Sequence, residues 1–144
     1  MIDLSKKFCS RAWEFIEVND DSGLKMFNCC PNWVNNYDLG RIEYNTDFDS
    51  VWNGAKSQEF RKSILDGSFR YCNKTQCPMI QNNSLPDVED ILNGFHDEYY
   101  KKIIENNLLI SDNCNFINLC YDVSCNLRCP SCRPNFLFLT STGT

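Results

Sequence analysis

The feature that most constrains this chain is its cysteine content, ten residues in 144, gathered in short clusters. One group comprises Cys9, the adjacent Cys29 and Cys30, and the pair Cys72 and Cys77. The first seven residues lack the apolar core of a secretion signal, so we expect a cytoplasmic protein. In a reducing compartment, clustered cysteines are more often metal ligands or catalytic thiols than disulfides. The sequence therefore predicts metal or thiol chemistry.

Charge and hydropathy argue against several classes of protein. Lys and Arg number 14 against 19 Asp and Glu, and the net charge of −5 disfavours nucleic acid as a partner. The sequence contains no run of 18 apolar residues, so we expect no spanning helix and no membrane partner. Hydrophobic residues make up 42% of the chain, which argues against disorder. We expect one small domain, or one domain with part of another.

Apolar patterns and turn signals predict an α+β fold with short hairpins and helices. Residues 13–27 are typical of two short strands joined by a turn at 19–23. A second hairpin is expected around 37–44, with Gly40 at its turn. Alternating apolar residues predict a further strand over 116–123.

Helices are expected between and after these strands. The longest is predicted to start at an Asp cap at position 47 or 49 and to run through Leu65. It should stop at Asp66 and Gly67, because glycine readily takes the left-handed conformation that ends helices. Two shorter helices are expected, one following Pro86 and one covering 99–104.

The Cys72-x4-Cys77 loop comes directly after the predicted helix stop. Its two thiols are therefore well placed to complete a site begun by Cys9 and Cys29. Spacing alone leaves open whether such a site holds zinc through four thiolates or an iron–sulfur cluster.

A second cysteine group lies near the end of the chain, where Cys125, Cys129 and Cys132 form a Cys-x3-Cys-x2-Cys triplet. Three thiolates on a short loop can converge on one cluster or ion while leaving one coordination position open. An open position is typical of a reactive centre, whereas four protein ligands close a structural one. Cys114 and Cys120 precede the triplet at a spacing that favours core or surface thiols over ligands.

The segment 122–132, with Asn126 and Leu127 between its first two cysteines, resembles the signature loop of radical S-adenosylmethionine enzymes. The resemblance implies a 4Fe-4S cluster held by Cys125, Cys129 and Cys132. It also implies S-adenosylmethionine on the open iron, where reduction yields a deoxyadenosyl radical. The strand over 116–122 would then be the first strand of the barrel.

Residues 8–80 resemble the SPASM domain, an auxiliary iron–sulfur module attached to many radical S-adenosylmethionine enzymes. The matching segments are 8–10, 23–33, 51–54, 60–69, 71–72 and 77–78. The resemblance implies that Cys9, Cys29, Cys72 and Cys77 hold an auxiliary 4Fe-4S cluster. Cys30 is the alternative to Cys29, since adjacent residues on a strand point in opposite directions. Arg11, Arg61 and Arg70 are candidates to offset the cluster charge, with paired surface positions as the alternative.

The two resemblances divide the chain into a SPASM-like domain at 1–82, a helical connection at 83–112 and the start of a radical S-adenosylmethionine domain at 113–144. That last domain is expected to be truncated, because a barrel needs on the order of 200 residues. The chain therefore resembles the front part of an enzyme and is too short for a complete catalytic barrel. The resemblance implies a peptide or protein substrate and a reductant protein as partners. The alternative is a zinc-binding structural or interaction module without redox activity.

Overall fold

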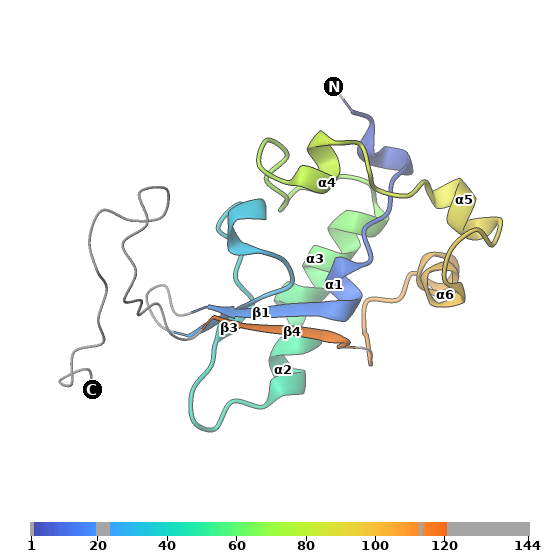
Figure 1. Cartoon of the computed structure of the whole chain (residues 1–144). Coiled ribbons are helices and arrows are strands. Elements are labelled where there is room, and N and C mark those ends of the chain that lie inside the picture. Colours follow the sequence, from blue (N-terminus) through green and yellow to red (C-terminus); the bar gives the residue numbers. More distant parts are fainter. Residues whose placement is uncertain (1, 20–23, 113, 121–144) are drawn as a thin grey trace.

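A computed structural model describes residues 2–19, 24–112 and 114–120, and the expected α+β fold is confirmed (Figure 1). A four-stranded mixed sheet is combined with short helices. The elements in chain order are η1 (Leu4–Lys6), α1 (Arg11–Glu14), β1 (Phe15–Asn19), β2 (Lys25–Phe27), η2 (Pro31–Trp33), β3 (Gly40–Arg41), α2 (Phe48–Trp52), α3 (Ala55–Leu65), α4 (Pro78–Gln81), α5 (Val88–Leu92), α6 (Glu98–Asn106) and β4 (Phe116–Cys120).

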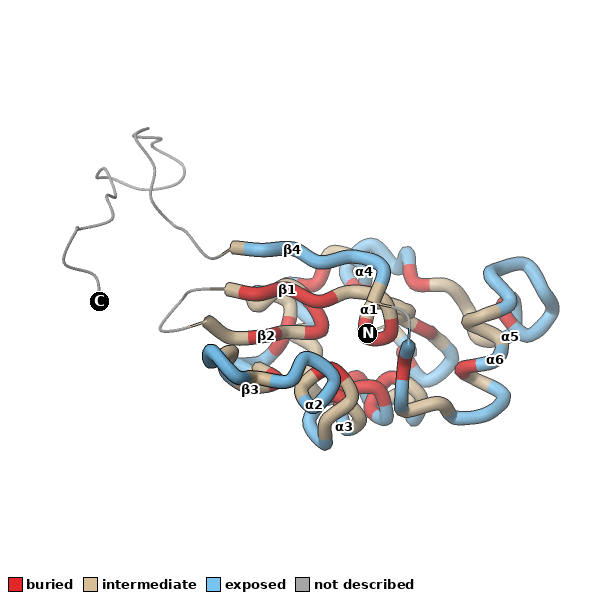
Figure 2. Tube along the Cα trace, turned by 90° about the horizontal axis from the view of Figure 1, so that it is seen from below, coloured by how far each residue is buried: buried red, intermediate tan, exposed pale blue. Residues whose placement is uncertain are grey.

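The sheet has the strand order β3-β2-β1-β4, and Figure 2 shows the four strands side by side. β1 and β2 pair antiparallel with Glu17 opposite Phe27, so the predicted pairing of the first two strands is confirmed, but Trp13 lies in α1 and not in a strand. β4 pairs parallel with β1, with Phe15 opposite Phe116, and the strand predicted near the end of the chain is confirmed over its described part. The sheet therefore joins residues from the first and third predicted segments of the chain.

The second predicted hairpin is wrong. Gly40 and Arg41 form strand β3 and pair antiparallel with β2. The Leu39 N–H donates to the Met26 carbonyl at 2.7 Å, and the Ile42 N–H donates to the Leu24 carbonyl at 2.8 Å. Gly40 has φ +136°, a conformation that glycine adopts without strain, so this glycine serves a strand and not a turn.

The single helix predicted to end at Leu65 is instead two helices, α2 and α3, separated at Asn53 and Gly54. A Cβ atom at Gly54 would lie 2.4 Å from the carbonyl oxygen of Ser50, so this close turn needs glycine. Gly67 has φ +74°, as predicted for the residue that ends α3. The two helices expected after Pro86 and over 99–104 correspond to α5 and α6. No helix in the described ranges is long and apolar enough to cross a membrane.

Buried apolar side chains form two clusters. The larger packs around α1, α3 and α6 and includes Phe8, Trp13, Phe60 and the cysteines Cys29 and Cys77. The smaller lies against the sheet and contains Ile16, Val18, Met26, Leu39 and Trp52.

A buried arginine connects elements from distant parts of the chain. Arg61 of α3 is 0% exposed and donates from Nε to the Ala12 carbonyl at 2.9 Å. Its Nη1 donates to the Leu109 carbonyl at 2.8 Å, and its Nη2 to the Trp52 carbonyl at 3.0 Å. Burial lowers the pKa of Arg61 to about 10, so the guanidinium is still charged at neutral pH. Arg61 therefore ties α1, the end of α2 and the segment before β4 to one point.

Replacing Gly67 with alanine should destabilise the fold, because the new Cβ would lie 2.7 Å from the Ser5 Cα and 3.1 Å from the Ser5 carbonyl oxygen. Backbone strain at positive φ adds to this clash, and we expect a loss of roughly 3 kcal/mol in the free energy of unfolding. Denaturant titration of Gly67→Ala measures the loss. Gly94→Ala is the matched control, since Gly94 has φ +84° with open space around its Cβ position, and should lose only about 1 kcal/mol. Equal losses in the two variants would contradict the contact with Ser5.

Candidate metal centre

Cys9 is positioned by its neighbours on both sides. The Phe8 N–H donates to the Pro86 carbonyl at 3.0 Å, and the Phe8 ring packs on Trp13 at a centroid distance of 5.4 Å. After Cys9 the chain enters α1, whose Ala12 carbonyl accepts the hydrogen bond from Arg61. The start of α1 is therefore fixed to the core, and Cys9 with it.

Cys29 lies just beyond the end of β2. The preceding residue, Asn28, is buried and donates from Nδ2 to the Ala12 carbonyl at 3.4 Å. Its Oδ1 accepts a hydrogen bond from the Ser57 hydroxyl at 3.0 Å. The same carbonyl that holds α1 thus also holds the strand end that carries Cys29.

The neighbouring Cys30 lies in a different environment. It lines a polar cavity of about 410 Å³ together with Glu17, Lys25 and Asp38. Cys29, in contrast, is buried in the apolar core cluster. This placement favours Cys29 over Cys30 as a partner for Cys9.

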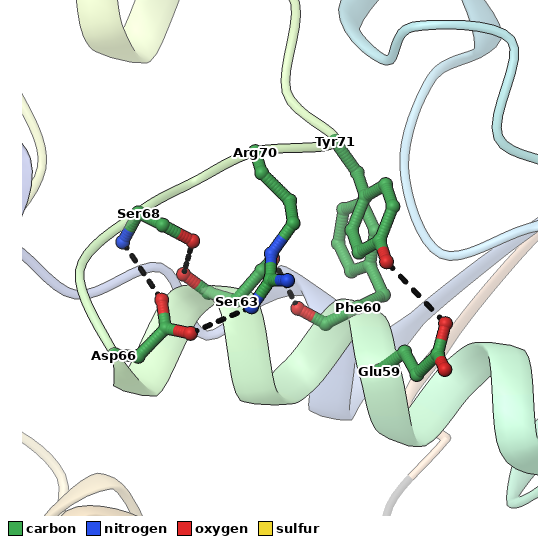
Figure 3. A network of polar contacts seen from close by, with 7 residues as sticks. All are labelled: Glu59, Phe60, Ser63, Asp66, Ser68, Arg70 and Tyr71. Atoms are coloured by element: carbon green, nitrogen blue, oxygen red, sulfur yellow. Dashed lines mark hydrogen bonds and ion pairs between the residues drawn. The ribbon is translucent and has the colours of Figure 1, made fainter.

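The loop that carries Cys72 is held to the end of α3 by polar contacts (Figure 3). The Ser68 N–H donates to the Asp66 Oδ1 at 2.9 Å, and Arg70 Nη2 donates to the Asp66 Oδ2 at 2.8 Å. The Tyr71 hydroxyl donates to the Glu59 Oε2 at 3.3 Å. Arg70 therefore pairs with a carboxylate at the surface, the alternative that the sequence left open for it.

Cys77 follows on a tight turn that also fixes Cys72. The Cys72 N–H donates to the Phe69 carbonyl at 3.0 Å, and the Cys77 N–H donates to the Asn73 carbonyl at 2.9 Å. Cys77 precedes α4, whose first residue is Pro78, a favoured residue at this helical position. The turn thus directs both cysteines to the same side.

Four cysteines from three separate parts of the sequence line one small cavity of about 20 Å³. They are Cys9, Cys29, Cys72 and Cys77. All four are free thiols. The remaining wall is apolar or aromatic except for one charged side chain, Arg11; its other residues are Trp33, Phe60, Ile64, Phe69, Met79, Ile80 and Leu85. The structure therefore brings together the four cysteines that the sequence singled out.

The environment of these thiols disfavours their ionised form. Burial raises the pKa of Cys9 to about 11 and that of Cys72 to about 12, and it raises the pKa of Cys29 as well. Repulsion between neighbours adds to burial, since Cys9 raises the pKa of both Cys29 and Cys72. Four thiolates need a positive charge in the cavity to coexist at neutral pH. A metal centre is the group that would supply this charge.

The cysteines surround the cavity and do not meet at one point. Within the described residues, no group of three or more His, Cys, Asp or Glu side chains has an arrangement that would hold a metal ion as it stands. Zinc requires four sulfurs at about 2.3 Å from a common centre, so a zinc site would need these side chains to turn inward. A group larger than one metal ion would need the four cysteine side chains to turn outward.

Cys125, Cys129 and Cys132 lie outside the described residues. Cys114 and Cys120 are half-buried, and Cys114 packs beside the smaller core cluster.

The cavity adjoins a second, larger cleft, which the sequence did not indicate. The cleft has a volume of about 390 Å³ and shares four wall residues with the cavity: Cys9, Arg11, Met79 and Leu85. The Pro78-Met79 sequence signals the start of α4, but nothing local indicates that Met79 lies against cysteines.

Comparison of the chain with family models, with curated proteins and with solved structures found no match.

The buried thiols should make the metal-free, reduced protein sensitive to alkali. Because their pKa values are raised on folding, the native state binds more protons than the unfolded state, and stability falls as pH rises from about 9 toward 11. Each such thiol can contribute a fall of about 1 kcal/mol per pH unit in this window. Cys72→Ala should therefore show a shallower fall than the wild-type chain in urea titrations at pH 8, 9.5 and 10.5. Parallel pH profiles of the two proteins would contradict this reading.

Proposed function

We propose that Cys9, Cys29, Cys72 and Cys77 hold an iron–sulfur cluster of the 4Fe-4S type, and that the chain is an auxiliary-cluster part of a radical S-adenosylmethionine protein. One observation carries the proposal: thiols far apart in the sequence line the same buried cavity without forming disulfides. When bound, such a cluster supplies one-electron transfer.

The donor set and the walls both fit this group. Four thiols match the four protein ligands of a closed cluster site. The apolar and aromatic walls, including Phe60 and Phe69, would limit access of water.

Binding requires adjustment of the cavity walls. A cavity of about 20 Å³ holds roughly one water molecule, so the cysteine side chains must turn outward around a cluster. Met79 is the wall residue best suited to yield, because its unbranched side chain is flexible and it is 37% exposed. It also borders the larger cleft, which gives it space to move.

The second part of the proposal concerns Cys125, Cys129 and Cys132, which would hold a cluster that leaves one iron open for S-adenosylmethionine. It rests on the sequence resemblance, since these residues lie outside the described ranges. One feature of β4 supports it: Phe116, Ile117 and Leu119 are each at least 58% exposed. Exposed apolar side chains in a row are typical of a surface that further structure covers, as expected for a strand that begins a barrel.

As part of such an enzyme, the chain would act in the cytoplasm on a peptide or protein substrate and receive electrons from a reductant protein. The cluster in the four-cysteine cavity would be the auxiliary one. The cluster held by Cys125, Cys129 and Cys132 would bind S-adenosylmethionine. A zinc-binding module is the alternative, because four thiolates also match a structural zinc site.

Metal analysis after anaerobic purification and reconstitution tests the proposal. We expect brown protein with iron and acid-labile sulfide, about eight irons per chain if both sites are filled. Cys72→Ala should lose about half of the iron, and Cys129→Ala should lose the other half. Cys30→Ala is the matched control and should retain all of it, since Cys30 lies in a separate cavity.

Colourless protein with stoichiometric zinc and no sulfide would overturn the proposal in favour of the zinc module. Full iron content in Cys72→Ala would show that the described cavity is not the site.

A further inference from the structure

Arg11 lies in the wall between the cysteine cavity and the larger cleft. Its guanidinium carbon is 4.1 Å from the centroid of the Phe15 ring and 5.1 Å from that of Trp33. These cation–π contacts hold the guanidinium group in place. Arg11 is the one charged residue in the lining of the cysteine cavity.

The Nε atom of Arg11 is buried and has no hydrogen-bond partner among the described residues. Within the same residues, Arg11 also makes no ion pair with a carboxylate. Buried donors in folded proteins are nearly always paired, so an unpaired one needs an explanation. Arg61 shows the contrast, because each of its three guanidinium nitrogens donates a hydrogen bond.

The electrostatic influence of Arg11 reaches the cysteine sulfurs. Its positive charge lowers the pKa of both Cys9 and Cys29, opposing the larger effect of burial. The backbone N–H of Arg11 also favours the Cys9 thiolate. Two groups on the same residue thus act on the sulfurs of this cavity.

Two other charged groups influence these cysteines. Glu14 lines the cleft and raises the pKa of Cys9, but its Oε2 accepts a hydrogen bond from the Tyr100 hydroxyl at 3.2 Å. Lys74 lowers the pKa of Cys72 from an exposed position, where solvent screens its charge. Of these three charged side chains, Arg11 alone lines the cysteine cavity.

We propose that Arg11 donates its Nε–H to a sulfur of the bound cluster and so raises the reduction potential of that cluster. The inference rests on the proposed function. Reduction adds one electron from an external reductant without making or breaking a bond, and the cluster becomes more negative. A charge-assisted hydrogen bond to sulfur strengthens with this added charge, so Arg11 stabilises the reduced form more than the oxidised form. Arg11 acts here as a positioning and tuning residue, not as a ligand.

A redox titration followed by electron paramagnetic resonance tests the inference. The background is the full chain with Cys125, Cys129 and Cys132 changed to Ala, so that one cluster gives the signal. At a fixed applied potential, Arg11→Gln should shift the ratio of reduced to oxidised cluster about tenfold toward the oxidised form, which is ~59 mV for one electron. Arg11→Lys keeps the charge but loses the Nε–H and should shift the ratio about threefold. Arg70→Gln, at the exposed pair with Asp66, is the control and should match the parent.

The outcomes separate the two proposals. Iron and sulfide in every variant with unchanged potentials would overturn the role of Arg11 and leave the proposed function standing. Absence of iron and sulfide from the parent protein would overturn both. If Arg11→Gln does not retain the cluster, Arg11→Lys decides: a lowered potential supports the inference, and the parent potential overturns it.

Discussion

The hydrogen bonds of Arg61 to three backbone carbonyls connect α1, the end of α2 and the segment before β4 at one buried side chain. The Ala12 carbonyl receives the Arg61 Nε–H and also the side-chain amide of Asn28. The helix that follows Cys9 and the strand end that precedes Cys29 are therefore fixed to the same atom. No described carboxylate forms an ion pair with Arg61, so carbonyl and amide dipoles together with the Trp52 ring stabilise its charge. The cysteine cavity depends on this arrangement, because it sets the position of two of its four thiols.

Sequence reasoning identified the elements whose signals are local. The paired strands β1 and β2 and the end of α3 at Gly67 are encoded by a few adjacent residues, and both predictions are confirmed. The prediction of a turn at Gly40 was wrong because a glycine with positive φ fits an edge strand as well as a turn. The break at Gly54 depends on its closeness to the Ser50 carbonyl, which apolar spacing does not reveal. The parallel pairing of β4 with β1 joins distant residues, so no local pattern predicts it.

In the candidate site, too, contacts between residues distant in sequence could not be predicted from local patterns. Cysteine spacing together with the family resemblance singled out Cys9, Cys29, Cys72 and Cys77, and all four line one cavity. The alternation of side chains on strands raised the choice between Cys29 and Cys30, which only the fold places in different cavities. Three arginines looked equivalent in sequence, yet Arg61 supports the backbone, Arg70 pairs with Asp66 and Arg11 faces the cysteines. The environment of an arginine is set by elements far from it in the chain, and this is why sequence could not assign these roles.

The separation between the partners of Arg61 affects the order of events during synthesis. All four cavity cysteines precede α4, whereas the Leu109 carbonyl that completes the bonding of Arg61 emerges from the ribosome some thirty residues later, at about 5–20 residues per second. β4, whose Asn118 bonds to Glu17 across 101 positions, emerges later still. During this interval the hydrogen bond between Arg61 and the Leu109 carbonyl cannot yet form. Nascent chains therefore have a stage in which the four thiols have been synthesised before Leu109 and β4 can take their places in the fold.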